Sequence, residues 1–478
     1  MKLYQLTVQK IGEMLARREI KAQEVLESVS ERISQVEHRI QAFTTLTLES
    51  ARDAAMDFDN RGKITGLAGI PCGIKDNLCT RGVKTTCASK MLEEFIPPYD
   101  ATAVNKLKTA GAVMVGKMNM DEFAMGRSTG SSNFYPTRNP WDLTRVSGGS
   151  SGGAAAAVAA GEVFYALGSD TGGSIRLPAS YCGVVGMKPT YGRVSRYGLV
   201  TFASSMDQVG PVTRNVTDCA LVMNAICGYD CLDSNSLQAE VPDYLGYLQT
   251  DIKGMKIGFP REYFINELDE DVKNAIKKAL LKYEELGAVV EETSLPHSKY
   301  AQPVFQIIAS AETSSSMARF DGVRYGYRDE DAQEIAEMMS NSRARGFGPE
   351  VKRRILLGTH VLSKGSYEAY YLKAMKVRRL IKDDFDRAFE KYDLLVSPTT
   401  VSVAFKPGAM TEAVCDILTT PANLAGIPAI SIPGGMVDDL PVGLQLMGRP
   451  LAEGTLLKAA YAFEQATDYH LRTPVLEV

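Results

Sequence analysis

The sequence predicts a single α/β domain in which helices cover both faces of a central mixed β-sheet. One observation is a strand–helix–strand succession: an apolar run at residues 255–259, a helix with one apolar face at 272–286, and a second short strand at 288–290. This succession is the building block of a sheet with helices on its faces. The other observation is that the 478 residues contain no internal repeat, low-complexity tract or linker-like stretch. One domain is therefore favoured over several independent ones.

Residues 1–60 are predicted to form packing helices. Thr7 is suited to cap the first helix, and apolar residues at helical spacing mark a second helix through 25–36. A third helical stretch covers about 48–58.

Residues 61–230 are predicted to form the core of the domain. A buried strand at 69–74 delivers Lys75 at its end. Further elements follow it: a helix at Thr102–Thr109, a strand at 112–115 and an alanine-rich helix at 154–160. Residues 231–478 are predicted to complete the sheet and the substrate pocket. Beyond the unit described above, they hold a long helix at 366–391, strands at 394–396, 430–432 and 444–446, and a final helix at 455–464.

Composition argues against several classes of protein. No apolar run reaches the roughly 18 residues of a membrane span, and the N-terminal segment lacks the apolar core of a secretion signal. A cytoplasmic protein with no membrane partner is therefore expected. The eight cysteines are scattered and form no CxxC pair, which argues against a disulfide scaffold and a zinc site. The net charge of −4 disfavours a chain that grips nucleic acid alone.

Two glycine clusters that hold serines flank the alanine-rich helix: SGGSSGG at residues 147–153 and DTGGS at residues 170–174. Consecutive glycines let the backbone approach a substrate closely and point successive N–H groups at negative charge. An acyl-transfer enzyme needs such donors beside its nucleophile, because an oxyanion develops there. Ser174 follows two glycines directly and suits the role of the nucleophile.

Three other chemistries compete for these motifs. Residues 149–153 match the G-x-S-x-G motif of Ser-His-Asp hydrolases with Ser151 as nucleophile, but that motif follows a strand and residues 140–145 are not strand-like. The four histidines are scattered, although position alone does not exclude His360. Asp170 opens one D-T-G of the aspartic protease type, without the second copy that mechanism needs. The clusters also lack the G-K-[ST] ending of a phosphate-binding loop.

A serine activated by a lysine remains. Lysine acts as a base only when it is neutral, which requires a buried position that lowers its pKa. Lys75 is placed for this role at the end of a buried strand, although a lysine there is more commonly a surface residue. A second serine, Ser150, could relay the proton between Lys75 and Ser174.

Together the two clusters resemble the amidase signature family, whose catalytic group is a serine, a cis-peptide serine and a lysine. The resemblance covers nearly the whole chain and implies a single amidase domain with residues 61–230 as the catalytic core. It places the nucleophile on Ser174, the cis-peptide serine on Ser150 and the base on Lys75. It also implies an oxyanion hole built from backbone N–H groups, those of Thr171, Gly172, Gly173 and Ser174.

Later motifs narrow the resemblance within that family. Residues 321–326 (DGVRYG), 350–355 (EVKRRI) and 420–428 (TPANLAGIP) are similar to the glutamine-hydrolysing A subunits of tRNA-dependent glutamyl/aspartyl amidotransferases. In those proteins an arginine and an aspartate hold the α-carboxylate and the α-ammonium of glutamine. By motif these roles fall on Arg354 and Asp416. A zwitterion does need one fixed charge of each sign, but without the resemblance both residues would be interpreted as ordinary helix positions.

The resemblance implies a glutaminase that passes ammonia to a partner subunit. That partner would use ATP and Mg²⁺ to convert Glu-tRNA(Gln) to Gln-tRNA(Gln) and would hold most of the tRNA. The chain itself would need no cofactor or metal, and two further subunits, B and C, would complete a heterotrimer. Two alternatives stay open: a stand-alone amidase that acts on small amides, and a scaffold subunit whose serine site is vestigial.

Overall fold

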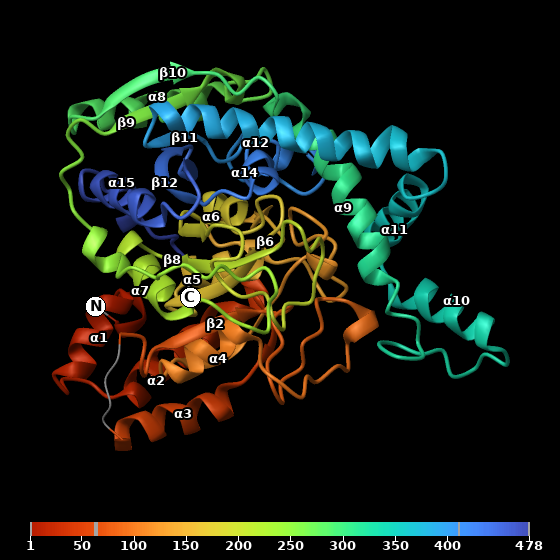
Figure 1. The fold of residues 1–478 in the computed structure, drawn as a ribbon. Coiled ribbons are helices and arrows are strands. Elements are labelled where there is room, and N and C mark those ends of the chain that lie inside the picture. The colour runs from red at the N-terminus through yellow and green to blue at the C-terminus, as the bar shows by residue number, and fades with distance from the viewer. Residues whose placement is uncertain (1, 62–65, 410–411, 477–478) are drawn as a thin grey trace.

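One large β-sheet runs through the molecule (Figure 1). The computed structural model describes residues 2–61, 66–409 and 412–476. In these residues eleven strands form one sheet: β1 Phe43–Leu46, β2 Pro71–Lys75, β3 Val113–Met118, β6 Tyr165–Asp170, β7 Val185–Lys188, β8 Gln208–Thr213, β9 Lys256–Pro260, β10 Val289–Thr293, β11 Leu394–Pro398, β12 Ala429–Val437 and β13 Leu440–Gly448. Their spatial order is β1-β3-β2-β6-β8-β7-β12-β13-β11-β9-β10.

The sheet is mixed, as the sequence predicted. Strand β2 runs parallel to β3 and β6, whereas β6 runs antiparallel to β8. The predicted strand–helix–strand unit is also confirmed, because β9 and β10 are parallel neighbours. Every residue of β2, β6, β8, β11 and β13 is buried. Strands buried on both sides require cover on both faces of the sheet.

Helices supply that cover. They are α1 Val8–Ala16, α2 Ala22–Ile40, α3 Leu48–Arg61, α4 Thr102–Thr109, α5 Gly152–Ala160, α6 Arg176–Cys182, α7 Val216–Ile226, α8 Glu270–Glu285, α9 Ala301–Met317, α10 Ile335–Gly346, α11 Pro349–Val361, α12 Lys373–Lys391, α13 Glu412–Cys415, α14 Thr420–Ala425 and α15 Glu453–Gln465. Thr7 caps α1 as predicted, since its side chain accepts the N–H of Lys10. The alanine-rich α5 packs against β2, β6, β8 and α6, because alanine and glycine let a helix lie close to a sheet.

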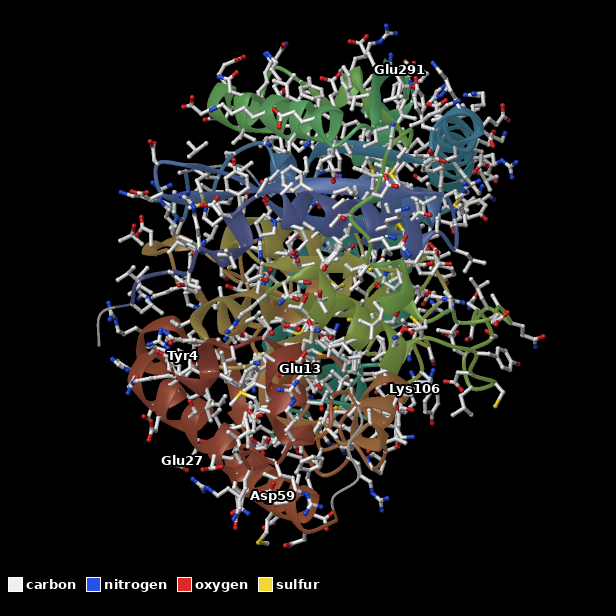
Figure 2. All side chains as sticks on the ribbon, turned by 90° about the vertical axis from the view of Figure 1, so that its left-hand side faces the viewer. Tyr4, Glu13, Glu27, Asp59, Lys106 and Glu291 are labelled. Carbon is white, nitrogen blue, oxygen red and sulfur yellow. The ribbon has the colours of Figure 1, made fainter. Side chains whose placement is uncertain are left out.

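The figures show the two ends of the molecule and a helical extension. Glu291, on the edge strand β10, and Asp59, on α3, lie at opposite ends (Figure 2). Helices α9, α10 and α11 extend to one side of the sheet together with the start of α12 (Figure 1). In the described residues, no helix combines the length and apolarity that crossing a membrane requires.

One local prediction was wrong. Residues 140–145 were expected not to be strand-like, yet β5 (Asp142–Val146) pairs antiparallel with β4 (Arg138–Asn139) in a separate small sheet. Polar contacts join the two strands, since Asn139 donates its side-chain amide to the carbonyl oxygen of Val146. Within β5, Asp142 accepts the N–H and the hydroxyl of Thr144. Such a hairpin needs no alternating apolar pattern, which is why the sequence did not reveal it.

Candidate active site

Lys75 ends β2 and is completely buried. Its Nζ lies 2.7 Å from Ser150 Oγ, 2.8 Å from Ser151 Oγ and 3.2 Å from the carbonyl oxygen of Ser169. Burial lowers the pKa of Lys75 to about 7, although nearby negative charges, led by that of Asp121, act in the opposite direction. Near neutral pH a large fraction of this amine is therefore uncharged, which is the state that a base requires.

The two serines that meet Lys75 differ in what their hydroxyls can do. Ser151 donates its proton to the carbonyl oxygen of Ser169 at 3.0 Å and accepts the N–H of the same residue at 3.3 Å. Within the described residues, the hydroxyl of Ser150 is hydrogen-bonded only to Lys75. Because a hydroxyl carries one proton, Ser150 can give its proton to the amine, whereas that of Ser151 is already committed.

The peptide bond between Gly149 and Ser150 is cis, as the resemblance implied. Gly149 leaves no room for a side chain, since a Cβ there would lie 2.0 Å from Oδ2 of Asp121. A Cβ on Gly153 would lie 2.5 Å from the carbonyl oxygen of Asn119. The first glycine cluster therefore allows the backbone to lie directly against the loop that follows β3.

Ser174 lies beside the first cluster, between Gly173 and the start of α6. Its carbonyl oxygen accepts the N–H of Ser151 at 3.1 Å, and the residue is 8% exposed. Its hydroxyl makes no hydrogen bond to another described residue. The structure thus brings Lys75, Ser150 and Ser174 to one place, but the last hydrogen bond of the predicted relay is not formed.

The predicted oxyanion donors fall into two groups. The N–H of Gly173 donates to Oδ1 of Asp170 at 2.8 Å, so it is not available to a substrate in this structure. Among the described residues, the N–H groups of Thr171, Gly172 and Ser174 have no hydrogen-bond acceptor. These three groups stay candidates for an oxyanion hole, and the sequence-based assignment of Gly173 disagrees with the geometry.

Asp170 organises this second cluster. It is fully buried and forms an ion pair with Arg176, with Nε 3.1 Å from its Oδ2 and Nη2 3.1 Å from its Oδ1. Asn423 donates to the same carboxylate at 2.8 Å. Burial alone would raise the pKa of Asp170, but Arg176 and its other partners outweigh burial and hold the pKa at about 2. A permanently charged carboxylate therefore fixes the loop that carries Ser174.

Arg354, on α11, is fully buried rather than on a helix surface. Its Nε lies 2.7 Å from Oε1 of Glu350, and its guanidinium stacks over the ring of Phe202 at 5.1 Å. Its Nη1 is buried and has no hydrogen-bond partner among the described residues. A buried guanidinium nitrogen without an acceptor is costly, and a substrate carboxylate would supply the acceptor.

Asp416 lies just after α13 and is 5% exposed. Its Oδ2 is 2.6 Å from Nε of Arg127, and its Oδ1 accepts Nε2 of Gln302 at 2.5 Å. Its carbonyl oxygen is 3.1 Å from the Thr419 hydroxyl, which lies 2.7 Å from the carbonyl oxygen of Gly172. The Thr419 hydroxyl therefore lies between Asp416 and the Ser174 loop and can donate its proton to either carbonyl oxygen.

Three residues of this region were not predicted from the sequence. Asp121 and Arg127 lie within seven residues of each other in the loop after β3, and Gln302 lies on α9. A signal was available for the loop residues. The segment MGRSTGSS at 125–132 is rich in small and polar residues, as are loops that approach a site. No such signal marks Gln302, which meets Asp416 only through the tertiary fold.

The competing chemistries find no support in the geometry. Ser151 is held by Lys75 and Ser169 and is not hydrogen-bonded to a histidine. His297 pairs with Asp384, and the ring of His360 lies beside that of Tyr370. In the part of the chain that the structure describes, no group of three or more His, Cys, Asp or Glu side chains is arranged to hold a metal ion.

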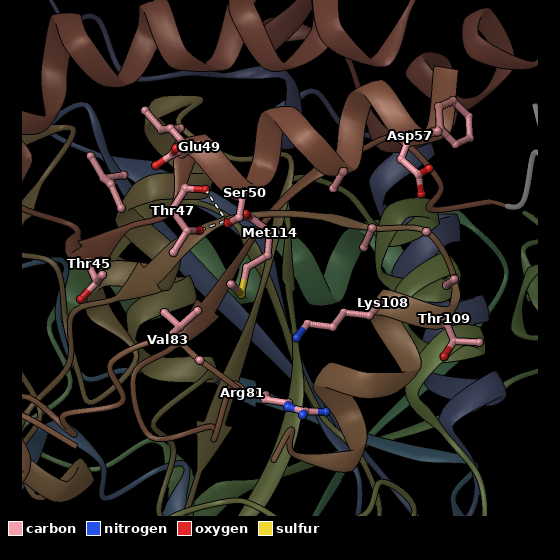
Figure 3. A pocket seen from close by; sticks show the side chains of 18 of the residues that line it. Thr45, Thr47, Glu49, Ser50, Asp57, Arg81, Val83, Lys108, Thr109 and Met114 are labelled. Carbon is pink, nitrogen blue, oxygen red and sulfur yellow. Dashed lines mark hydrogen bonds between the residues drawn. The ribbon is translucent and has the colours of Figure 1, made fainter. Parts of the chain in front are cut away.

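A pocket of about 980 Å³ lies elsewhere, between α3, the end of α4 and the loop that carries Arg81 (Figure 3). Its labelled polar side chains include Thr47, Glu49 and Lys108. None of the residues that line it belongs to the cluster around Lys75 and Ser174.

Comparison with known proteins agrees with this geometry. The family model described as Amidase matches residues 24–457. The chain is 59% identical to the A subunit of glutamyl-tRNA(Gln) amidotransferase from Moorella thermoacetica, with all of both chains covered. It is also 59% identical to the protein of the same name from Desulforudis audaxviator, with 99% of this chain and 98% of the relative covered.

Solved structures are similar over the same length. The crystal structure of the A subunit of glutamyl-tRNA(Gln) amidotransferase from Thermotoga maritima is 42% identical, with a TM-score of 0.82 over 100% of this chain and 99% of that one. Native peptide amidase from Stenotrophomonas maltophilia is 29% identical, with a TM-score of 0.85 over 99% of both chains. From the matched family model and these full-length relatives, we conclude that the chain belongs to the amidase family.

Proposed function

We propose that this chain is the glutamine-hydrolysing subunit of a tRNA-dependent amidotransferase. The contact that supports the chemistry most strongly is the 2.7 Å approach of the buried Lys75 amine to Ser150. The full-length similarity to subunits of that name supports the biological role. An amidase needs a nucleophile, a base and oxyanion donors, and the cluster offers candidates for each.

The first half of the reaction forms an ester. Neutral Lys75 takes the proton of Ser150, which takes the proton of Ser174, and Ser174 Oγ attacks the carbon of the side-chain amide. The carbonyl oxygen becomes an oxyanion, which the N–H groups of Thr171 and Gly172 would hold. The tetrahedral adduct collapses as the proton returns through Ser150 to the amide nitrogen. Ammonia leaves, and the glutamyl group stays on Ser174.

The second half repeats the proton path with water in place of Ser174. Water gives a proton to the relay and attacks the ester, and the proton then returns to Oγ of Ser174 as glutamate departs. Three hydrogen-bond acceptors surround Nζ of Lys75 and suit its charged form. The neutral form needs one neighbour to donate instead, and Ser150 is the neighbour whose proton is uncommitted.

Arg354 and Asp416 would hold the α-carboxylate and the α-ammonium of glutamine. Two further subunits, B and C, would complete a heterotrimer in the cytoplasm. The ammonia would pass to the subunit that binds ATP and Mg²⁺ and grips most of the tRNA, so Glu-tRNA(Gln) would become Gln-tRNA(Gln). Side chains and N–H groups supply every step proposed for this chain, which therefore would hold no cofactor of its own.

Trapping of the ester tests the nucleophile. The purified protein is mixed with glutamine, quenched in acid and digested, and the peptide that contains Ser174 is weighed by mass spectrometry. We expect a glutamyl adduct on Ser174 that disappears in Ser174→Ala and persists in Ser234→Ala, a change at an exposed serine. Glutamine hydrolysis that survives Ser174→Ala, with no adduct on the wild-type serine, would rule out this mechanism.

A stand-alone amidase is the second candidate, favoured by the TM-score of 0.85 to peptide amidase. Such an enzyme would hydrolyse simple amides at full rate without partner chains and would not need Arg354. Glutamine turnover that is abolished by Arg354→Gln and stimulated by co-purified partner chains would exclude it.

A further inference from the structure

Arg127 occupies a position between the catalytic cluster and the proposed amino-acid subsite. It is 5% exposed, and its Nε lies 2.6 Å from Oδ2 of Asp416. Its backbone passes directly along the first glycine cluster, since a Cβ on Gly149 would lie 2.8 Å from the carbonyl carbon of Arg127. One side of this residue thus lies against the segment that carries Ser150, and its guanidinium reaches Asp416.

Asp416 is held on both of its carboxylate oxygens. Gln302 donates to Oδ1 at 2.5 Å, and the guanidinium of Arg127 lies at Oδ2. A buried carboxylate is costly unless it is paired and hydrogen-bonded. Arg127 therefore balances the charge of the carboxylate that is proposed to bind the substrate ammonium.

Arg354 is balanced less completely. Its partner Glu350 is shared with Arg353, whose Nε and Nη2 both lie 2.7 Å from the same carboxylate. Arg353 has a side chain that is 53% exposed, so water screens its charge. Arg354 is fully buried, and its Nη1 lacks a hydrogen-bond acceptor among the described residues.

Arg354 and Arg127 are both connected to the loop that carries Ser174. Arg354 stacks over Phe202, whose ring packs against that of Phe305, and a Cβ on Gly172 would lie 2.8 Å from Phe305. The carbonyl oxygen of Gly172 lies 2.7 Å from the Thr419 hydroxyl, which is next to Asp416, the partner of Arg127.

Burial lowers the pKa of Arg354, and the charge of Arg127 lowers it further. The buried positive charges of Arg127 and Arg354 thus have two carboxylates as ion-pair partners. Asp416 pairs with Arg127, whereas Glu350 is shared between Arg354 and Arg353. The excess of positive charge favours a ligand that brings a carboxylate of its own.

We propose that Arg127 is a specificity-determining residue that shares the substrate carboxylate with Arg354 while it remains paired with Asp416. This inference rests on the proposed glutaminase function. A zwitterion adds no net charge to the site and satisfies Arg354, whereas an amide that carries only an ammonium group would add a positive charge beside two guanidinium groups. Arg127 thereby makes the pocket select amides whose far end carries a carboxylate.

Three substrates distinguish the contribution of the α-carboxylate of glutamine from that of its α-ammonium. L-glutamine carries both groups, glutarate monoamide keeps the carboxylate alone, and 4-aminobutanamide keeps the ammonium alone. We would measure kcat/KM for each with the full-length chain and its co-purified partners, in wild type, in Arg127→Gln and in Arg379→Gln. The last variant is the matched control, because it removes an exposed guanidinium on α12 that is paired with Asp383 and not with a residue of the proposed site.

In Arg127→Gln we expect the ratio of kcat/KM for glutamine to that for 4-aminobutanamide to fall by on the order of tenfold or more, as for the loss of a hydrogen bond to a charged group. The fall should arise mainly from a higher KM for glutamine. Glutarate monoamide should lose as much as glutamine. Arg379→Gln should leave the ratio at its wild-type value. Arg127→Lys keeps the positive charge but not the planar guanidinium, and its ratio should lie between those of wild type and Arg127→Gln.

Other outcomes overturn the proposal. An equal loss for all three substrates would give Arg127 a structural role only. A loss confined to glutamine and 4-aminobutanamide would mean that Arg127 does no more than hold Asp416. If Arg127→Gln does not fold, Arg127→Lys is the test, because lysine lacks the planar guanidinium. If Arg127→Lys keeps the wild-type ratio of kcat/KM for glutamine to that for 4-aminobutanamide, Arg127 does not share the substrate carboxylate with Arg354. Wild-type protein that fails to hydrolyse glutamine would instead refute the proposed function.

Discussion

Lys75 and Lys117 are both completely buried on neighbouring strands, yet their surroundings are opposite in kind. Lys75 meets two hydroxyls and a carbonyl oxygen. Lys117 forms an ion pair with Asp76 at 3.4 Å and donates to the hydroxyl of Thr85. Burial lowers the pKa of both lysines, but a carboxylate in contact favours the charged form and hydroxyls do so much less. Burial alone therefore does not make a lysine a base. The groups that contact the amine, hydroxyls for Lys75 and a carboxylate for Lys117, distinguish the two lysines.

Strand geometry explains how the two lysines are kept apart. In the parallel pair β2–β3, Lys117 lies opposite Ile74, and Lys75 lies opposite Met118. Because successive side chains of a strand point to opposite faces, Lys75 and Lys117 point to different sides of the sheet. Asp76 follows Lys75 in sequence but points to the side of Lys117. The alternation therefore gives the adjacent carboxylate to the structural lysine and leaves Lys75 to the serines.

The largest expected effect is on catalysis at Lys75. In Lys75→Met, glutamine hydrolysis should fall by about 10²–10⁴-fold, because the proton of Ser174 loses its acceptor. Far-UV circular dichroism should stay as in wild type, since methionine suits a fully buried position. Steady-state ammonia release measures the effect. Turnover within tenfold of wild type would remove Lys75 from the mechanism.

Lys117→Met should instead affect stability. It leaves Asp76 buried without its ion-pair partner, which costs about 3 kcal/mol or more. Chemical denaturation followed by circular dichroism measures the free energy of unfolding, and the double variant Lys117→Met/Asp76→Asn should recover part of the loss. At a temperature where the variant is folded, kcat should remain near the wild-type value. A loss of kcat as large as that of Lys75→Met would break the distinction between the two lysines.

A smaller effect is expected on the pH profile. Since the pKa of Lys75 is lowered to about 7, the amine is charged below that pH and neutral above it, so kcat/KM should rise as pH increases through about 7. The negative charge of Asp121 raises this pKa, and Asp121→Asn should therefore move the rise toward lower pH. Asp251→Asn, a change at an exposed aspartate, is the control. A rise that stays in place or moves toward higher pH in Asp121→Asn would contradict the electrostatic account.

The sequence predicted much of this fold because strong local patterns coincide with the elements. Helix α4 begins and ends where it was expected, and β9, α8 and β10 form the predicted unit. The sequence did not predict β6, because its residues YALGSD show no alternation of apolar and polar positions. This segment forms a strand because it pairs with β2 on one side and β8 on the other. The same limit applies to β5, where local polar contacts replace the usual pattern.

For the site, the sequence identified the residues that lie within motifs. Lys75, Ser150 and Ser174 come together as anticipated, whereas their catalytic roles stay predictions. The commitment of the Gly173 N–H to Asp170 could not be foreseen, because it depends on the rotamer of one buried carboxylate. Arg127 lies 289 residues from its partner Asp416, and no spacing rule links positions so far apart.

Direct titration of the Lys75 amine tests the central claim. Protein labelled with ¹⁵N in its lysine side chains would be followed by NMR between pH 5 and 11, and the Lys75 resonance assigned by its absence in Lys75→Met. We predict a midpoint near 7 for Lys75. A Lys75 midpoint near 10, as for a lysine in water, would mean that the amine is charged when the enzyme works and cannot accept the proton of Ser174.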